Sequence, residues 1–257
     1  MCAYPTQNFK TSQVYFSQME RLKDQVALIT GGGRGIGAEI AKQVAQQGAT
    51  VVLIARTAEQ LQATAELIRQ YGGTAFWFSA DVSDMSAMRE AVQKTLGIAD
   101  RIDILVNNAG FIRSYAPIAQ SDPDEWWHTL EGNLKGMYNT IRLVLPTMLE
   151  QGSGQIVNIL SVAGMRAFNG LSAYSCAKSA GLMLTRVLAK EVRKQGIRVS
   201  AVLPGAVDTA IWGEESAIDR SKMIRPESVA QTVLHILTLP PDATVDEVLI
   251  LPQEGIL

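Results

Sequence analysis

Residues 26–37 read VALITGGGRGIG, an apolar run that leads directly into a glycine-rich turn. Four apolar residues followed by Thr30 are typical of a short buried strand. The turn Gly31–Gly37 is followed by apolar residues at helical spacing, among them Ile40 and Val44. Strand, glycine turn and helix in this order favour an α/β fold in which the turn binds the phosphates of a dinucleotide.

Short apolar runs and amphipathic stretches continue to alternate along the rest of the chain, with no linker, repeat or low-complexity segment between them. This alternation predicts a single-domain doubly wound (Rossmann) parallel sheet with helices on both faces. We assign this domain to residues 23–257 and an N-terminal tail to residues 1–22. The further strands are predicted at 50–55, 74–80, 102–106, 156–160, 197–203 and 248–251, and the later helices at 57–71, 83–97, 122–151, 173–195 and 226–237.

Composition narrows the classes of protein to consider. The chain has 257 residues, of which 47% are hydrophobic, and a net charge of -2. This charge gives no case for a nucleic acid or an anionic membrane as partner, and no apolar run reaches the ~18 residues that a membrane span needs. Two cysteines, Cys2 and Cys176, predict neither a disulfide framework nor a metal site, so a reducing, cytoplasmic location is expected. The two histidines, His128 and His235, are expected to be ordinary surface or packing residues.

A tyrosine, a lysine and a serine form a second informative pattern. Tyr174 and Lys178 stand four residues apart, so a helix would place both side chains on one face. A phenol titrates near ~10, and bringing its pKa to about 7 requires ~4 kcal/mol, which one cation at ~4 Å could supply. Ser161 follows the predicted strand 156–160 and would lie at the carboxyl edge of the sheet. On its own, the Tyr-x-x-x-Lys spacing also fits a tyrosine ring that packs on a lysine stem.

The second predicted strand ends without the acidic residue that often binds the ribose 2′-hydroxyl of NAD. Ala55 occupies that position, and Arg56 follows it. Together with Arg34 in the glycine turn, Arg56 could bind a 2′-phosphate, which suits guanidinium groups in charge and geometry. The sequence therefore predicts NADP(H) as cofactor, and the alternative is that Arg56 caps a surface loop.

Several short motifs occur in a fixed order along the chain: Thr30–Gly37, Asp81–Val82, Asn107–Gly110, Asn133, Ser161, Tyr174 with Lys178, and Pro204–Thr209. In this order and spacing they resemble the short-chain dehydrogenases/reductases of the NADP-preferring type, from about Lys23 to Leu251. The resemblance implies an enzyme that interconverts a carbonyl and a secondary alcohol by hydride transfer.

The resemblance also implies a role for each motif. Tyr174 would be the proton donor or acceptor, and Ser161 would orient the substrate oxygen. Lys178 would hold the nicotinamide ribose and lower the pKa of Tyr174, while Asn133 would support a water relay through its backbone. Asp81 and Val82 would contact the adenine. Besides Tyr174 and Lys178, the residues implied to bind NADP(H) are Gly31, Arg34, Gly35, Ile36, Gly37, Arg56, Asp81, Val82, Asn107, Ala109, Gly110, Pro204, Gly205, Val207 and Thr209.

Loops expected around the site suggest apolar walls for a small-molecule substrate. The residues that suggest them are Phe111, Met165, Phe168, Ile211 and Trp212. Arg113 and Arg166 could meet an anionic group or could be solvated. The ending 251–257 differs from the glycine-paired ending of ketoacyl-carrier-protein reductases, so the substrate of that branch is not carried over.

Two other classes of function stay open, and so does the assembly. One is a catalytically silent dinucleotide-binding regulator of the same fold, and the other is a Rossmann-like methyltransferase, which would have no use for Tyr174 with Lys178. The helices at 122–151 and 173–195 carry more apolar residues than one sheet face needs, so a homodimer or homotetramer is expected. The residues that suggest this are Leu143, Val144, Leu182 and Leu184.

Overall fold

The computed structural model describes residues 20–113, 115–212 and 219–256. Its centre is a seven-stranded sheet in the order β3-β2-β1-β4-β5-β6-β7, and every neighbouring pair is parallel. The predicted doubly wound fold is confirmed. The strands are β1 Val26–Thr30, β2 Thr50–Ala55, β3 Thr74–Ser79, β4 Ile104–Asn107, β5 Gly154–Ile159, β6 Ile197–Pro204 and β7 Glu247–Ile250.

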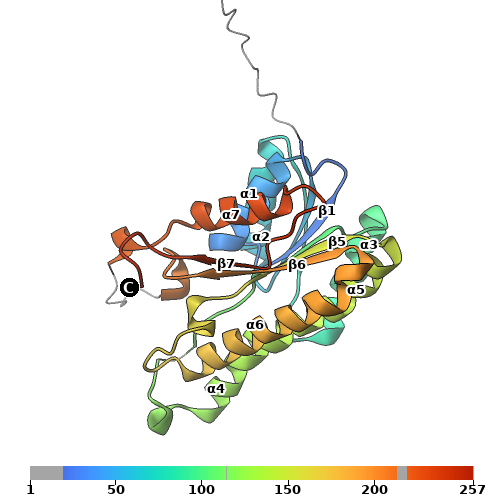
Figure 1. Cartoon of the computed structure of the whole chain (residues 1–257). Coiled ribbons are helices and arrows are strands. Elements are labelled where there is room, and N and C mark those ends of the chain that lie inside the picture. The colour runs from blue at the N-terminus through green and yellow to red at the C-terminus, as the bar shows by residue number, and fades with distance from the viewer. Residues whose placement is uncertain (1–19, 114, 213–218, 257) are drawn as a thin grey trace, which may run out of the picture.

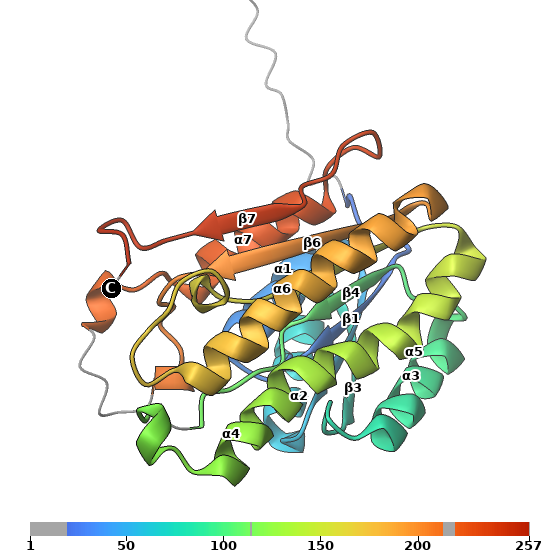
Figure 2. The same ribbon diagram turned by 60° about the horizontal axis from the view of Figure 1, so that its bottom comes forward.

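Helices cover both faces of this sheet. The helices are α1 Gly35–Gln46, α2 Ala58–Gln70, α3 Met85–Ala99, α4 Pro123–Leu130, α5 Gly136–Gln151, α6 Ser172–Val192 and α7 Pro226–Leu237. Figure 1 shows α1 and α7 on one side of the sheet and α5 and α6 on the other, and Figure 2 brings the second layer forward. Side chains of β1 alternate between the layers, since Ala27 and Ile29 pack with α1, α2 and α7, whereas Leu28 packs with α3, α5 and α6.

The order of the strands creates a crevice at the carboxyl edge of the sheet. The chain proceeds outward from β1 to β2 and β3, and then returns to place β4 on the other side of β1. The loops after β1 and β4 therefore leave the sheet in opposite directions, which opens a crevice between them where ligands bind in folds of this kind.

The predicted helix 122–151 is interrupted, so this prediction was wrong in its middle. Helix α4 ends at Leu130, a π-helical turn spans Glu131–Lys135, and α5 begins at Gly136. Within the turn, the Asn133 amide donates to the backbone oxygens of Thr129 and Phe111 at 2.9 and 2.8 Å. A single π-helical turn inside a helix often marks a functional site, and this one holds a residue that the sequence had singled out.

The sequence predicted that the folded domain begins at residue 23, but Leu22 also packs in it. Leu22 is fully buried in the core, and its backbone N–H donates to the oxygen of Gln47 at 2.9 Å. Residues 1–19 of the expected tail lie outside the described residues. In the part of the chain that the structure describes, no helix combines the length and the apolar character of a membrane span.

Candidate functional site

Side chains from β1 and the segment after β4 fix the glycine turn. The Asn108 amide donates to the backbone oxygens of Thr30 and Gly31 at 3.1 and 3.2 Å, and the Thr30 hydroxyl accepts from the N–H groups of Asn108 and Ala109. Gly31 has a φ of 67°, and a Cβ there would lie 2.7 Å from the Asn108 amide nitrogen. Only glycine fits this left-handed position so close to a neighbouring segment.

The turn leads into the N-terminus of α1, where its N–H groups are open to a ligand. The preceding residue, Arg34, gives the helix no side-chain cap. A Cβ at Gly37 would overlap the backbone oxygen of Gly31, so the helix can begin this close to β1 only with glycine at that position. Uncapped N–H groups at a helix N-terminus form an anion site, and the absence of side chains lets a pyrophosphate approach the backbone. The glycine turn therefore fits a dinucleotide.

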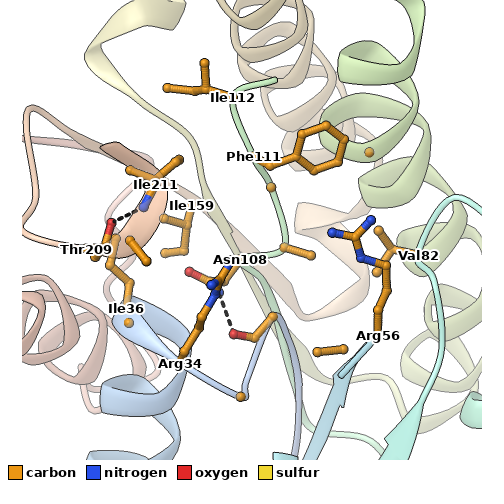
Figure 3. A pocket seen from close by; sticks show the side chains of 18 of the residues that line it. Arg34, Ile36, Arg56, Val82, Asn108, Phe111, Ile112, Ile159, Thr209 and Ile211 are labelled. Carbon is orange, nitrogen blue, oxygen red and sulfur yellow. Dashed lines mark hydrogen bonds between the residues drawn. The ribbon is translucent and has the colours of Figure 1, made fainter. Parts of the chain in front are cut away.

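A cleft of about 370 Å³ runs from this turn in two directions. At one end lie Arg56 after β2 and Asp81 after β3, and at the other lie Tyr174 and Lys178 of α6. Figure 3 shows Arg34, Asn108 and Arg56 around the first part of this cleft. The site residues predicted from the sequence that line it are Gly31, Arg34, Gly35, Ile36, Arg56, Asp81, Val82, Ala109, Gly110, Phe111, Tyr174, Lys178, Ile211 and Thr209.

The end of the cleft near β2 and β3 carries opposite charges. The Arg56 guanidinium lies 4.0 Å from the Asp81 carboxylate, and both side chains are partly exposed. Burial raises the pKa of Asp81, but hydrogen bonds from Ser83 and the charges of Arg56 and His128 outweigh it and hold this pKa below its usual value. Within the described residues Arg56 therefore faces the cleft with a single long ion pair, which leaves its N–H groups available to an anionic ligand.

Ser161, Tyr174 and Lys178 meet at the other end. Tyr174 and Lys178 are 9% and 4% exposed, and the Lys178 Nζ lies 5.4 Å from the centroid of the Tyr174 ring. The Ser161 Oγ accepts from the N–H of Ala163 at 3.1 Å, so its proton is free to be donated elsewhere. The structure thus brings the predicted serine, tyrosine and lysine together at one edge of the sheet.

The pKa of Tyr174 shifts in the direction opposite to the prediction. Burial raises it to about 12, a hydrogen bond with Ser161 lowers it in part, and nearby Tyr115 raises it further. The Lys178 ammonium donates to the backbone oxygen of Ile159 at 3.3 Å, and burial lowers its pKa to about 8. Loss of water around the phenolate therefore sets the direction of the Tyr174 shift, and the hydrogen bond with Ser161 offsets only part of it.

Asn133 lies behind Gly110, next to this cluster. A Cβ at Gly110 would meet the Asn133 side-chain oxygen and would lie 3.3 Å from the Lys178 Nζ. The Asn133 side-chain oxygen is buried and has no hydrogen-bond partner in the described part of the chain. An unpaired buried acceptor is rare, and here it identifies a polar position beside Lys178.

Asn107 does not line the cleft, in contrast to its predicted contact with a cofactor. It is buried on β4, and its amide donates to the Asn158 side chain on β5 at 2.8 Å. The Asn158 amide in turn donates to the Thr185 hydroxyl of α6 at 2.9 Å. This polar chain links β4, β5 and α6 beneath the site. The sequence signal for it was an asparagine inside the apolar run 156–160.

An apolar cavity of about 260 Å³ adjoins the hydroxyls of Ser161 and Tyr174. The predicted substrate residues Phe168 and Trp212 line it, and the Trp212 indole N–H donates to the backbone oxygen of Val207 at 2.8 Å. Gly37 supports the turn from beneath and lines neither space. Other residues that line the cavity include Ile112, Tyr115, Asn169, Leu171, Pro204, Gly205, Val207, Thr209, Ile211 and Ile256.

Two predicted substrate residues do not line this cavity. Phe111 lines the cleft, with its ring beside Gly132 and Arg56, and Met165 is 53% exposed after a short helical turn. Neither Arg113 nor Arg166 lines the cavity, and Arg113 lies 3.6 Å from the Glu125 carboxylate. Ile256 could not be predicted from a local pattern, because only the fold brings it to the same cavity as Ser161.

No group of histidine, cysteine and acidic side chains within the described ranges could hold a metal ion. The polar side chains that line the cleft and the cavity include Arg34, Arg56, Asp81, Ser161, Tyr174, Lys178 and Thr209. The arrangement can bind a dinucleotide along the cleft and present a proton-transferring phenol to a small molecule in the adjoining cavity.

Comparison with known proteins agrees with this arrangement. Residues 25–219 match the model of the short chain dehydrogenase family. An uncharacterised oxidoreductase of Staphylococcus saprophyticus is 38% identical over 235 residues, which cover 91% of this chain and 100% of that protein. The structure of a metagenomic short-chain oxidoreductase in complex with NADP has a TM-score of 0.81 and 33% identity, and the match covers 91% of this chain and 99% of that one.

An alcohol dehydrogenase from the archaeon Thermococcus sibiricus, complexed with 5-hydroxy-NADP, is also similar. Its TM-score is 0.82 at 29% identity, and the match covers 88% of this chain and 95% of that one. The family model spans most of the chain, and the staphylococcal relative matches over its whole length. The chain therefore belongs to the short-chain dehydrogenase/reductase family of oxidoreductases.

Proposed function

We propose that this protein is an NADP(H)-dependent oxidoreductase that interconverts a carbonyl and a secondary alcohol, with Tyr174 as the proton donor or acceptor. One observation carries the proposal. A single cleft connects the glycine turn and Arg56 to Tyr174 and Lys178, and the apolar cavity opens beside the hydroxyls of Ser161 and Tyr174. Cofactor-binding and proton-transferring groups thus share one continuous site.

The residues along the cleft suit a 2′-phosphorylated dinucleotide. The backbone of Gly31–Gly37 would hold the pyrophosphate, and Arg34 and Arg56 would hold the 2′-phosphate. Asp81 and Val82 would lie at the adenine, and Lys178 would hold the nicotinamide ribose. Val207 and Thr209 would lie at the carboxamide end. When bound, such a cofactor supplies or accepts the hydride.

The chain's own side chains handle the proton. In the direction of reduction, Tyr174 donates its hydroxyl proton to the carbonyl oxygen, and in oxidation the phenolate accepts it. Ser161, whose oxygen already accepts from a backbone N–H, donates its own hydrogen to the oxygen on which charge develops. Lys178 favours the phenolate form of Tyr174 as a nearby cation, and the Asn133 backbone would support a water relay toward Lys178.

The cavity favours a neutral substrate with an apolar body. The described residues that line it include no lysine, arginine, aspartate or glutamate side chain. A carboxylate or phosphate on the substrate would lose water there without gaining a partner of opposite charge, which is unfavourable. Tyr115 and Asn169 also line the cavity, and either side chain could bind a second oxygen of the substrate.

A screen of NADPH oxidation tests the proposal. The panel contains uncharged ketones, aldehydes, quinones, ketoacyl thioesters and, as matched controls, keto acids. We expect turnover with uncharged carbonyl compounds and little with keto acids of the same carbon skeleton. NADPH binding without turnover on any member of the panel would favour a silent regulator. Failure to bind any nicotinamide cofactor would favour a methyltransferase.

Assembly and location stay predictions. We expect a homodimer or homotetramer, and a cytoplasmic protein whose partners are small molecules.

A further inference from the structure

Phe111 lies in the cleft proposed to bind the cofactor, although the sequence predicted that it would contact the substrate. Its ring lies 5.6 Å from the centre of the Arg56 guanidinium and 5.1 Å from the His128 ring, at an interplanar angle of 36° to the latter. Figure 3 shows Phe111 and Arg56 on the same side of the cleft, beside Val82. Phe111 thus forms a contact between the loop after β2 and helix α4, which carries His128.

The fold fixes the position of this ring. A Cβ at Gly132, in the π-helical turn, would overlap two carbon atoms of the Phe111 ring and press against a third at 3.2 Å. The ring therefore occupies the space that any larger residue at position 132 would fill. The Phe111 backbone is held at the same time, because its carbonyl oxygen accepts from the Asn133 amide at 2.8 Å.

Arg56 has few other contacts to hold it. Its side chain is 59% exposed, and its ion pair with Asp81 is long, at 4.0 Å. An ion pair of this kind contributes little in water and is screened by salt. The face of an aromatic ring, by contrast, attracts a guanidinium while leaving the N–H groups in its plane free to donate.

We propose that Phe111 is a positioning residue that holds Arg56 at the ribose end of the cleft and thereby strengthens discrimination for the 2′-phosphate. The inference rests on the proposed NADP(H) dependence, since it concerns how Arg56 would meet that phosphate. The ring orients the guanidinium, while Asp81 competes with the phosphate for the same N–H groups. Without the ring, the Arg56 side chain samples more rotamers. Binding an anion then costs more conformational entropy, because the side chain must be held in one rotamer, and the affinity falls.

Two adenosine fragments test this inference without catalysis. Adenosine 2′,5′-bisphosphate carries the 2′-phosphate and 5′-AMP does not, so the ratio of their dissociation constants by titration calorimetry measures discrimination alone. We expect Phe111→Leu to reduce this ratio about two- to fivefold, the effect of losing an exposed cation–π contact. Phe111→Tyr keeps the ring and should retain the parent ratio.

A double substitution separates positioning of Arg56 from general damage to the cleft. In an Arg56→Ala background, Phe111→Leu should leave the ratio unchanged, because its effect acts through Arg56. Gly132→Ala, which displaces the ring from the other side, should lower the ratio as Phe111→Leu does, and serves if the leucine variant does not fold. An unchanged or increased ratio in folded Phe111→Leu or Gly132→Ala would overturn the inference, since the ring would then not help Arg56 reach the phosphate.

The outcome for Arg56→Ala alone distinguishes this inference from the proposal on which it rests. If that substitution lowers the ratio and Phe111→Leu does not, only the positioning role of Phe111 fails. If Arg56→Ala leaves the ratio unchanged, Arg56 does not bind the 2′-phosphate as proposed, and the inference about Phe111 fails with that proposal.

Discussion

Lys178 is a buried cation whose environment favours its neutral form. Burial lowers its pKa to about 8, and among the described residues its ammonium donates one hydrogen bond, to the backbone oxygen of Ile159. A lysine whose pKa is lower in the folded chain than in the unfolded chain destabilises the fold at neutral pH. This cost in stability is expected at a functional position, where the ammonium would bind a ligand and act on Tyr174.

Replacing this lysine should therefore stabilise the protein while abolishing turnover. We expect Lys178→Met to raise the free energy of unfolding by about 1–3 kcal/mol at pH 7, an order-of-magnitude figure from the pKa shift less one lost hydrogen bond. Between pH 8 and 10.5 the unfolded chain binds more protons at this lysine than the folded chain, so the advantage of the variant should shrink. Urea unfolding at pH 7 and pH 9.5 measures both effects. A variant less stable than the parent at pH 7 would contradict the assignment.

Arg56 is a second single residue on which a proposed property depends, the preference for NADP(H) over NAD(H). Two partly exposed guanidinium groups, with charge-assisted hydrogen bonds discounted for screening, could favour NADPH over NADH by ~2–3 kcal/mol, or roughly a hundredfold. Arg56→Ala should weaken NADPH binding by about tenfold and leave NADH nearly unchanged, and added salt should narrow the preference of the parent. Arg89→Ala, which removes an exposed arginine of α3 from outside the cleft, is the matched control. Equal dissociation constants for the two cofactors in the parent at low salt would refute this role.

The glycine turn and the start of α1 pack closely, with Gly37 against the backbone of Gly31. Gly37→Ala would place a methyl group against the oxygen of Gly31 and 2.5 Å from the Asn108 amide nitrogen, which pins the turn. We expect a loss of about 1–3 kcal/mol in stability, as for overpacking elsewhere, and at least tenfold weaker NADPH binding because the anion site moves. Binding and urea titrations check both.

A second glycine supplies the control for that prediction. Gly97 lies in α3, and a Cβ there meets nothing within 4 Å. Gly97→Ala should leave cofactor binding unchanged and stabilise the protein by about 0.5–1 kcal/mol through helix propensity. If both glycine variants behaved alike, close approach at Gly37 would not explain the effect.

The elements that the sequence predicted well are those with a strong local signal. Apolar runs specified all seven strands to within about two residues, since a buried parallel strand has few alternatives. The π-helical turn at Glu131–Lys135 was missed, because the low helix propensity of Asn133 marks a weak point but does not specify its geometry. Phe111 was predicted to contact the substrate, but its ring lies in the cleft, in space left by the missing side chain of Gly132. A sequence does not show that these two residues meet, so this position could not be predicted.

The meeting of Tyr174 with Lys178 could be predicted from the sequence, whereas the apolar cavity could not, for a related reason. Tyr174 and Lys178 lie on one helix, so their spacing alone brings them together. The cavity is assembled from five separate segments, which include Ile112, Phe168, Trp212 and Ile256, and no local pattern encodes their meeting. The pKa of Tyr174 depended on burial, which a sequence does not reveal.

At the scale of the whole molecule, the predicted assembly rests on different residues from those first named. Val144 and Leu182 are buried, and Leu143 and Leu184 pack against the same core, so these four do not form an outer surface. Exposed apolar side chains do lie on α4, α5 and α6: Trp127, Tyr138, Leu149, Met183 and Val187. Such residues along neighbouring helices favour association of copies with closed symmetry.

We expect light scattering to show a dimer or tetramer at micromolar concentration. Val187→Glu, which places a charge on the exposed side of α6, should shift the protein toward a smaller species because an unpaired charge is unfavourable in an apolar interface. Tyr71→Glu, at an exposed position just after α2 in the other helical layer, should not. A monomeric parent would count against assembly through this surface.

Tyr174 is proposed to transfer the proton in an NADPH-dependent reaction of a carbonyl compound. Turnover of the Tyr174→Phe variant, measured by NADPH oxidation with a substrate that the parent reduces, tests it most directly. The substitution keeps the buried ring and removes the hydroxyl, so NADPH should still bind while turnover falls by at least the ~10²-fold typical of acid–base catalysis. Near-normal turnover by this variant would contradict the account.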